Sequence, residues 1–430
     1  MKTALEIARE LVKNTREFDA FEVICHRDRM TEMQIDAGEV SLLRTTENVN
    51  LTLRAIHGGR YATVDLNQTD SGSYAQALEK MREALKSAPV DEARALAPKG
   101  VGPEKASRGP TEPDLAKMHD RIVAFARGTA DQFRELKMEQ AMLQFNRDEA
   151  SRVNSLGYES EIGQGTYDFT AMFSGKRGDK TSSFNYSGAT SQDLDRELIE
   201  WGALKRIMQS SIREIDHEAF DGKFKGQVVI APEAVDNFVW PFLAHLGDDR
   251  LIAGTSQLRD KMEQQVASEL LTIRVNPERG SLGRREFATR EGYASKKGVI
   301  LKNGVLKTWL LSDYGARKTG LPRATTGAAN LEIDAGEISF ADLIKPIKKG
   351  LLLGRFSGGS PAANGEISGV AKNSYLIENG QVTKPLSEVM ISANVFDMLK
   401  QVEAVSRDRM DDGMTLKPYI RVNGVTVAGK

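Results

Sequence analysis

A short block between a strand-like run and a predicted helix holds the residues whose types and spacing come closest to metal chemistry. Residues 230–237 read Ile-Ala-Pro-Glu-Ala-Val-Asp-Asn. A glutamate at the start of a helix, such as Glu233, can serve as a general base when a metal-bound water lies beside it. Zinc needs about three protein ligands drawn from His, Cys, Asp and Glu. Pro232 has no side-chain donor atom, and the amide of Asn237 is a poor substitute for imidazole.

The same positions have a structural interpretation that needs no metal. Proline is common in the first turn of a helix, where its missing N–H would have had no partner. An acid in that turn is favoured by the helix dipole. We therefore predict that Pro232 begins the helix, that Glu233 is a first-turn acid, and that the block contains neither a catalytic residue nor a metal ligand.

The five histidines offer no alternative metal site, because none lies at ligand spacing from another. His217 and Glu218 are the only His-Glu pair, but the positions four and five residues after His217 hold Asp and Gly instead of the second His that a helical zinc motif requires. His245 precedes an acidic pair at 248–249. We expect an exposed connection at the first place and hydrated loop charge at the second.

Two further motif classes are absent from the sequence. The glycine-rich stretch 354–365 lacks the Lys-Ser/Thr ending of a phosphate-binding P-loop, so its glycines are expected to permit a close crossing of the backbone. No Gly-x-Ser-x-Gly nucleophile elbow occurs.

Composition excludes several classes of protein. The 430 residues suffice for two or three domains. Lys plus Arg (59) nearly cancel Asp plus Glu (60), which gives no support to nucleic-acid binding by long-range electrostatics. Cys25 is the single cysteine, predicted to be a buried thiol, and no disulfide can form within the chain. No apolar run approaches the roughly 18 residues of a membrane span, so we expect a cytoplasmic protein.

The first part of the chain predicts a small α/β domain. Thr3 and Glu6 have the spacing of a capping box, which places an amphipathic helix within residues 1–14. Strands are expected around 20–27, 30–36 and 48–57, with a tight hairpin at Gly58-Gly59 and a second helix carrying Leu78, Met81 and Leu85. The proline-rich stretch 89–113 is typical of a linker.

The middle and last parts predict different arrangements. A helix begins near Leu115, an antiparallel sheet follows over about 137–188, and a long helix is expected from about Ser191. The apolar face of that long helix would carry Leu194, Leu198, Trp201 and Met208. Beyond it, three Asn-Gly pairs each predict a hairpin, because both central positions of such turns need positive φ. These pairs are Asn303-Gly304, Asn379-Gly380 and Asn423-Gly424.

The predicted fold class is therefore α+β, or mixed α/β. We expect a small N-terminal α/β domain with its linker over 1–110, a middle α/β segment over 111–221, and a large β-rich domain with antiparallel hairpins over 222–430.

Three stretches of the sequence resemble a known family. They are the run Val228–Ile230 before the block, the glycine-rich stretch 354–365, and the pattern Tyr-Leu-Ile-Glu-Asn-Gly at 375–380. Together they resemble the TldD/PmbA, or modulator of DNA gyrase, family of metallopeptidase subunits, and most closely its PmbA (TldE) branch.

The resemblance locates a lost zinc motif. The TldD branch carries His-Glu-x-x-x-His, which falls here on Pro232, Glu233 and Asn237. A cysteine near the C-terminus completes that site in the zinc-bearing branch, and the corresponding stretch here, 411–414, has none.

The resemblance implies a subunit without zinc that pairs with a TldD-like, zinc-bearing chain to cleave peptides or unfolded segments. We expect no cofactor in this chain, no nucleic acid and no membrane among its partners, and leave a homodimer of the isolated chain open. Two alternatives also stay open: a non-enzymatic regulator of the DNA gyrase modulator type, and a stand-alone hydrolase with an unrecognised site. Whether this chain is itself an enzyme is undecided from sequence.

Overall fold

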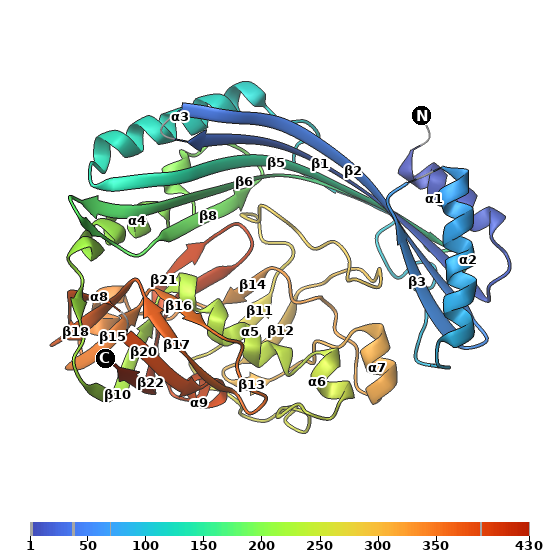
Figure 1. The fold of residues 1–430 in the computed structure, drawn as a ribbon. Coiled ribbons are helices and arrows are strands. Elements are labelled where there is room, and N and C mark those ends of the chain that lie inside the picture. The colour runs from blue at the N-terminus through green and yellow to red at the C-terminus, as the bar shows by residue number, and fades with distance from the viewer. Residues whose placement is uncertain (1–2, 37–38, 69, 388, 430) are drawn as a thin grey trace.

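The computed structural model describes residues 3–36, 39–68, 70–387 and 389–429. The 22 strands in these ranges form two large sheets, of eight and 14 strands (Figure 1). Both contain antiparallel and parallel neighbours, and helices cover parts of each. The predicted α+β class is confirmed.

The first sheet consists mainly of four long antiparallel strands. Its members are β1 (Ala20–Asp36), β2 (Glu39–His57), β3 (Arg60–Leu66), β4 (Lys105–Arg108), β5 (Leu136–Asn154), β6 (Glu159–Arg177), β7 (Lys180–Thr181) and β8 (Asn185–Ser191). They run in the order β3-β2-β1-β5-β6-β4, with β7 and β8 also paired to β6. Strands from 1–110 and from 111–221 thus share one sheet, and the boundary we drew between those segments stays a prediction.

The two strands expected at 20–27 and 30–36 are one continuous strand, so that expectation was wrong. Asp28 pairs with Asn48 on one side and Asp148 on the other, and the ladders of both neighbours continue through the polar residues. Backbone pairing on both sides holds the strand together where the sequence pattern is interrupted.

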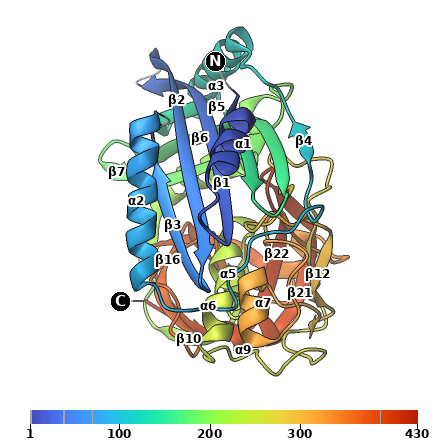
Figure 2. The same cartoon turned by 90° about the vertical axis from the view of Figure 1, so that its right-hand side faces the viewer.

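Two N-terminal helices pack on one end of this sheet (Figure 2). They are α1 (Ala4–Asn14) and α2 (Ser71–Ser87). The capping box at Thr3 and Glu6 is present, as predicted, although residues 1–2 of the predicted helix lie outside the described ranges. Met81 and Leu85 of α2 join the buried Cys25 in one apolar cluster, which confirms the buried thiol.

The long helix expected from Ser191 is wrong, although its apolar residues are buried. In its place are η1 (Leu198–Glu200) and α4 (Leu204–Arg213). Gly202 between them has φ +54°, and a Cβ there would lie 2.6 Å from the Gly188 carbonyl oxygen of β8. This close approach ends one helix before the next begins. Leu194, Leu198, Trp201 and Met208 still share a core with Ile122 of α3 (Leu115–Gln132).

The second sheet is formed by the C-terminal half of the chain. Its strands are β9 (Glu218–Ala219), β10 (Lys223–Ile230), β11 (Ile273–Val275), β12 (Gly298–Lys302), β13 (Val305–Leu306), β14 (Leu331–Ile333), β15 (Lys349–Leu353), β16 (Arg355–Gly358), β17 (Glu366–Lys372), β18 (Ser374–Glu378), β19 (Gln381–Ser387), β20 (Val389–Asn394), β21 (Val402–Asp411) and β22 (Leu416–Ala428). The shorter helices are η2 (Glu214–Asp216), η3 (Pro232–Ala234), α5 (Asp236–Ala244), α6 (Asp248–Ile252), α7 (Asp313–Thr319), α8 (Phe340–Ile344) and α9 (Val395–Lys400). Strand β10 lies inside the sheet, parallel to β15 and antiparallel to β22.

Two of the three predicted Asn-Gly hairpins are confirmed. Asn303-Gly304 joins β12 to β13 and Asn379-Gly380 joins β18 to β19, with positive φ at all four residues. The third prediction is wrong, because Asn423-Gly424 lies inside β22. There Gly424 has φ +77° and the pairing with β10 shifts register, so the pair forms a β-bulge instead of a turn.

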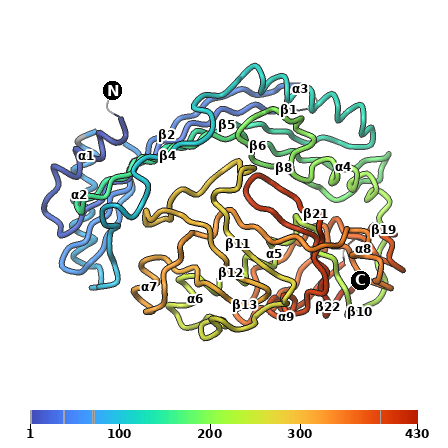
Figure 3. Tube along the Cα trace, turned by 180° about the vertical axis from the view of Figure 1, so that it is seen from behind, coloured from blue at the N-terminus to red at the C-terminus, as the bar shows by residue number. Residues whose placement is uncertain are grey.

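The segment 276–297 lies between β11 and β12 of the second sheet and forms hydrogen bonds with the first half of the chain. The Arg285 N–H donates to Gln164 Oε1 of β6 at 2.6 Å, and Tyr158 Oη donates to the Gly292 carbonyl oxygen at 2.7 Å. Seen from the front and from behind, the first sheet arches over the second half of the chain (Figure 1, Figure 3). In the part of the chain that the structure describes, no helix is long and apolar enough to cross a membrane.

Candidate functional site

The block singled out in the sequence forms a strand, a turn and a helix. Strand β10 ends at Ile230, as expected of the run before the block. Pro232 and Glu233 begin a short 3-10 turn, η3 (232–234), and not the helix itself, because α5 starts only at Asp236. Apolar residues of both elements, among them Phe238 and Phe242, are buried in the core of the second half of the chain and fix the helix against the sheet. Pro232 is buried at the start of the turn, whereas Asn237 is exposed.

Glu233 has a partner that the sequence did not predict. The guanidinium of Arg206, from α4, donates to both carboxylate oxygens of Glu233 at 2.9 and 2.7 Å. Burial would lower the pKa of Arg206, but the Glu233 carboxylate outweighs this and raises the pKa above its ordinary value. Bidentate pairs of this kind are among the stronger hydrogen-bonded contacts in proteins. In this arrangement Glu233 joins α4 to η3, which is a structural role for the carboxylate.

A buried lysine connects the helix to the stretch that the family resemblance associates with the missing cysteine. Lys417 Nζ lies 2.5 Å from Asp236 Oδ2 and 3.3 Å from Asp412 Oδ2, and the lysine side chain is only 5% exposed. Asp412 also accepts from the backbone N–H groups of Met414 and Thr415. Burial would lower the pKa of Lys417, but the two carboxylates raise it overall, so the ammonium stays protonated.

A charged cavity lies beside this block. It has a volume of about 440 Å³ and is lined in part by Pro232, Arg206, Tyr419, Arg409 and Asp411. The Arg206 guanidinium lies 5.7 Å from the centre of the Tyr419 ring. The cavity therefore presents cationic and aromatic groups next to the position of the family's motif.

The donor atoms in this region do not fit a zinc ion. Proline offers no ligand atom, Glu233 is engaged by Arg206, and the ammonium of Lys417 already balances the carboxylates of Asp236 and Asp412. Zinc sites use neutral imidazole, thiolate or carboxylate donors, and a protonated amine cannot coordinate. Whether this chain holds a metal stays a prediction.

Within the described ranges, the histidines belong to no cluster of three or more possible metal ligands. His217 Nδ1 contacts the Glu214 carbonyl oxygen at 2.9 Å. We expected hydrated loop charge around His245, and for the imidazole this is wrong. The ring is buried beside Phe396 and accepts a hydrogen bond from the Gln257 N–H. Burial lowers the pKa of His245. Asp248, three residues on, accepts from the Ser312 N–H at 2.9 Å. Local sequence does not reveal this packing, because it depends on distant segments.

The sequence also provided no indication of a buried carboxyl group at Glu214. Glu214 is 4% exposed and lines a cavity of about 580 Å³ together with His217. Its carboxylate oxygen contacts Ser210 Oγ and Tyr375 Oη, each at 3.2 Å. Burial raises the pKa of Glu214 to about 7. A lone Glu after a helix carries no sequence signal for such burial.

Comparisons with known proteins place the chain in a family. Residues 223–429 match the model of the PmbA/TldA metallopeptidase C-terminal domain, and residues 21–89 match PmbA/TldA metallopeptidase domain 1. A metalloprotease of Methanocaldococcus jannaschii is 32% identical over 201 residues, which cover 44% of each chain. The metalloprotease PmbA of Escherichia coli O157:H7 is 28% identical over 209 residues, 46% of each chain. These matches span about half the length of the curated relatives.

Solved structures share the fold over almost the whole chain. TldE from Thermococcus kodakarensis superposes with a TM-score of 0.84 at 20% identity, covering 98% of this chain and 99% of that one. A protein of Bacteroides thetaiotaomicron described as a candidate modulator of DNA gyrase gives a TM-score of 0.83 at 22% identity, covering 99% and 98%. Because two domain models and several relatives agree, the chain belongs to the PmbA/TldD metallopeptidase family.

Proposed function

We propose that this chain is a PmbA/TldE-like subunit that carries no zinc and works with a TldD-like, zinc-bearing chain in cleaving peptides or unfolded segments. The observation that carries the proposal is the ion cluster of Asp236, Asp412 and Lys417. An internal ammonium neutralises the carboxylates of Asp236, which lies within the block, and of Asp412. An active peptidase would need coordinating atoms for its metal here.

The relatives support the peptidase context. One of them, from Saccharolobus solfataricus, is called a zinc metalloprotease TldD homolog and is 27% identical over 232 residues. Family members thus include chains named for zinc as well as chains named TldE or PmbA. A peptide can add to the exposed edge of a sheet through backbone hydrogen bonds. This chain has two large sheets, whose outer strands include β3 and β13.

Co-expression with a TldD-type protein from the same genome tests the proposal. Cleavage of an unfolded peptide is measured for each chain alone and for the purified pair. We expect cleavage by the pair only, and loss of cleavage when the motif glutamate of the partner is replaced by glutamine. The matched variant here, Glu233→Gln, should leave cleavage by the assembled pair unchanged. Zinc-dependent cleavage by this chain alone would overturn the proposal and favour a stand-alone hydrolase.

A regulatory role is the second candidate. The observation in its favour is the structural likeness to the Bacteroides protein described as a candidate modulator of DNA gyrase. The formal net charge of −1 gives no support to direct DNA contact. Recovery of gyrase, without a TldD-like chain, in a pull-down from extract would favour this role over the peptidase subunit.

A further inference from the structure

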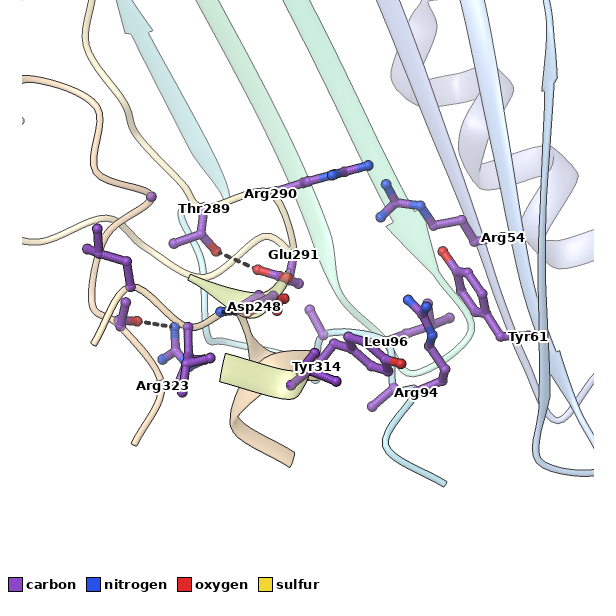
Figure 4. A pocket seen from close by; sticks show the side chains of 18 of the residues that line it. Arg54, Tyr61, Arg94, Leu96, Asp248, Thr289, Arg290, Glu291, Tyr314 and Arg323 are labelled. Atoms are coloured by element: carbon purple, nitrogen blue, oxygen red, sulfur yellow. Dashed lines mark hydrogen bonds between the residues drawn. The ribbon is translucent and has the colours of Figure 1, made fainter. Parts of the chain in front are cut away.

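A second cavity lies between the two halves of the chain, away from the block at 230–237. Its volume is about 460 Å³, within the range of small-ligand sites. One wall comes from β2, β3 and the loop 94–97, and the opposite wall comes from α6, the segment 289–291 and the start of α7 (Figure 4). No residue of 230–237 lines it.

Arginines line both walls of the cavity: Arg54 and Arg94 on the side of the first sheet, Arg290 and Arg323 on the opposite side. Arg54 pairs with the buried Glu22 at 3.1 Å, while its Nε is buried without a hydrogen-bond partner among the described residues. Arg290 is exposed, and within the described ranges its guanidinium forms no ion pair. In Figure 4 Arg290 and Arg54 extend toward one another across the cavity. Two guanidinium groups that face each other repel unless an anion lies between them.

A third guanidinium is held close by. Arg94 lies 3.7 Å from the ring centre of Tyr314 and 4.8 Å from that of Tyr61. Stacking between two rings fixes the guanidinium without neutralising it. Its nearest acid is Asp91, at 3.9 Å.

The opposite wall also carries three acids. Asp248, Asp249 and Glu291 line it beside Arg290 and Arg323. Asp248 accepts hydrogen bonds from the backbone N–H and the hydroxyl of Ser312. Asp249 is exposed, and Glu291 accepts one long hydrogen bond, from Thr289 Oγ1 at 3.5 Å. Cationic and acidic groups therefore both line the cavity, and the exposed Arg290 is the chain neighbour of Glu291 on the same wall.

We propose that this cavity binds a short peptide with free termini, whose carboxylate lies between Arg54 and Arg290 and whose ammonium group lies against Asp249 and Glu291. Guanidinium groups bind carboxylates with paired, charge-assisted hydrogen bonds. A purely anionic ligand such as phosphate fits less well, because it leaves the carboxylates of Asp249 and Glu291 in the same cavity without a cationic partner from the ligand. The site does not depend on the proposed peptidase role, although a peptide product belongs to the same ligand class.

Calorimetry on the full chain with trialanine tests the site. The arms are trialanine, its C-terminal amide, its N-acetyl form, and inorganic phosphate. Since hydrogen bonds to a charged group are worth more than neutral ones, the amide should bind at least about tenfold more weakly than trialanine. The N-acetyl form should also bind more weakly, and phosphate should not compete. Equal binding of acid and amide, absence of trialanine binding at millimolar concentration, or strong competition by phosphate would overturn the proposal.

A pair of variants separates this site from the rest of the surface. Arg290→Gln removes an exposed guanidinium without an ion pair, so the fold is retained, and the preference for acid over amide should disappear. Arg259→Gln is the matched control, because Arg259 is exposed and does not line the cavity. Retention of the full preference in Arg290→Gln would refute the assignment.

Discussion

Lys417 places a protonated amine between carboxylates from two separate segments of the chain. Asp236 begins α5, and Asp412 lies in the connection from β21 to β22. Removing one member of a buried ion cluster lowers the stability of the fold by more than the intact cluster adds to it. The remaining charges stay buried, away from water, and no longer have a partner of opposite charge. The lysine therefore holds a helix to a strand connection as well as balancing charge.

Replacing Lys417 by Met should destabilise the fold. Asp236 is 37% exposed and stays partly hydrated, so we expect a loss of about 2–3 kcal/mol, below the range for a fully buried pair. Urea unfolding measures the change. The triple variant with Asp236→Asn and Asp412→Asn removes the stranded charges and should recover most of the loss. A single variant as stable as the wild type would contradict the assigned role.

Glu214 predicts a pH dependence of stability. Because burial raises its pKa from 4.5 to about 7, the folded state favours the protonated acid. Its contribution is fully present below pH 4.5 and is lost as pH rises to about 7, since the unfolded state releases the proton first. The shift corresponds to about 3 kcal/mol.

Glu214→Gln has no proton to lose, so its stability relative to wild type should rise by that amount from pH 4.5 to pH 7, measured by urea unfolding across the range. Glu218→Gln, at an exposed glutamate nearby, serves as the control and should show no comparable trend. Parallel pH profiles for wild type and Glu214→Gln would show that the carboxyl ionises normally.

The composition of the site could be predicted, but its contacts could not. Pro232 and Asn237 lack suitable ligand atoms, and this is visible in the sequence alone. The partners of the block are distant in sequence: Arg206 lies 27 residues before Glu233, and Lys417 lies 181 residues after Asp236. No local periodicity or spacing encodes such pairs, which form only when the sheet brings the segments together.

At the scale of elements, short sequence motifs predicted the structure correctly where neighbouring residues alone determine the backbone conformation. The capping box of α1 and the turns at 303–304 and 379–380 are examples. The hairpin predicted at Asn423-Gly424 is absent because a residue with positive φ fits a β-bulge as well as a turn. Here the strand continues in pairing with β10, so the pair forms the bulge. The single long helix expected from Ser191 is interrupted at Gly202, where a neighbouring strand lies too close for a side chain to fit.

The bulge makes Gly424 sensitive to substitution. Gly424→Ala puts a side chain at φ +77°, and its Cβ would lie 2.4 Å from Gln401 Oε1. Gln401 can move, so backbone strain dominates, and we expect a loss of about 1–2 kcal/mol. Thermal unfolding measures it. Gly226→Ala on the facing strand is the control, since its φ is ordinary and the nearest atom is 3.5 Å away. Equal melting temperatures for both variants would argue against a strained bulge.

At the scale of the whole molecule, the sequence indicated the fold class and the family but not how the strands are shared between sheets. Long-range partners decide this: β22, near the end of the chain, pairs with β10, β14, β20 and β21. The segment 276–297 then joins the second sheet to the first and helps to form the cavity of Figure 4. Such pairings emerge only from the complete fold.

Zinc content distinguishes a subunit without metal from a metallopeptidase that works alone. It is measured by elemental analysis of the isolated chain and of its complex with a TldD-type partner. We predict negligible zinc in the isolated chain and about one zinc per pair in the complex, retained when Glu233 is replaced by glutamine. Near-stoichiometric zinc in the isolated, full-length chain would contradict the proposal that Lys417 stands in place of a metal.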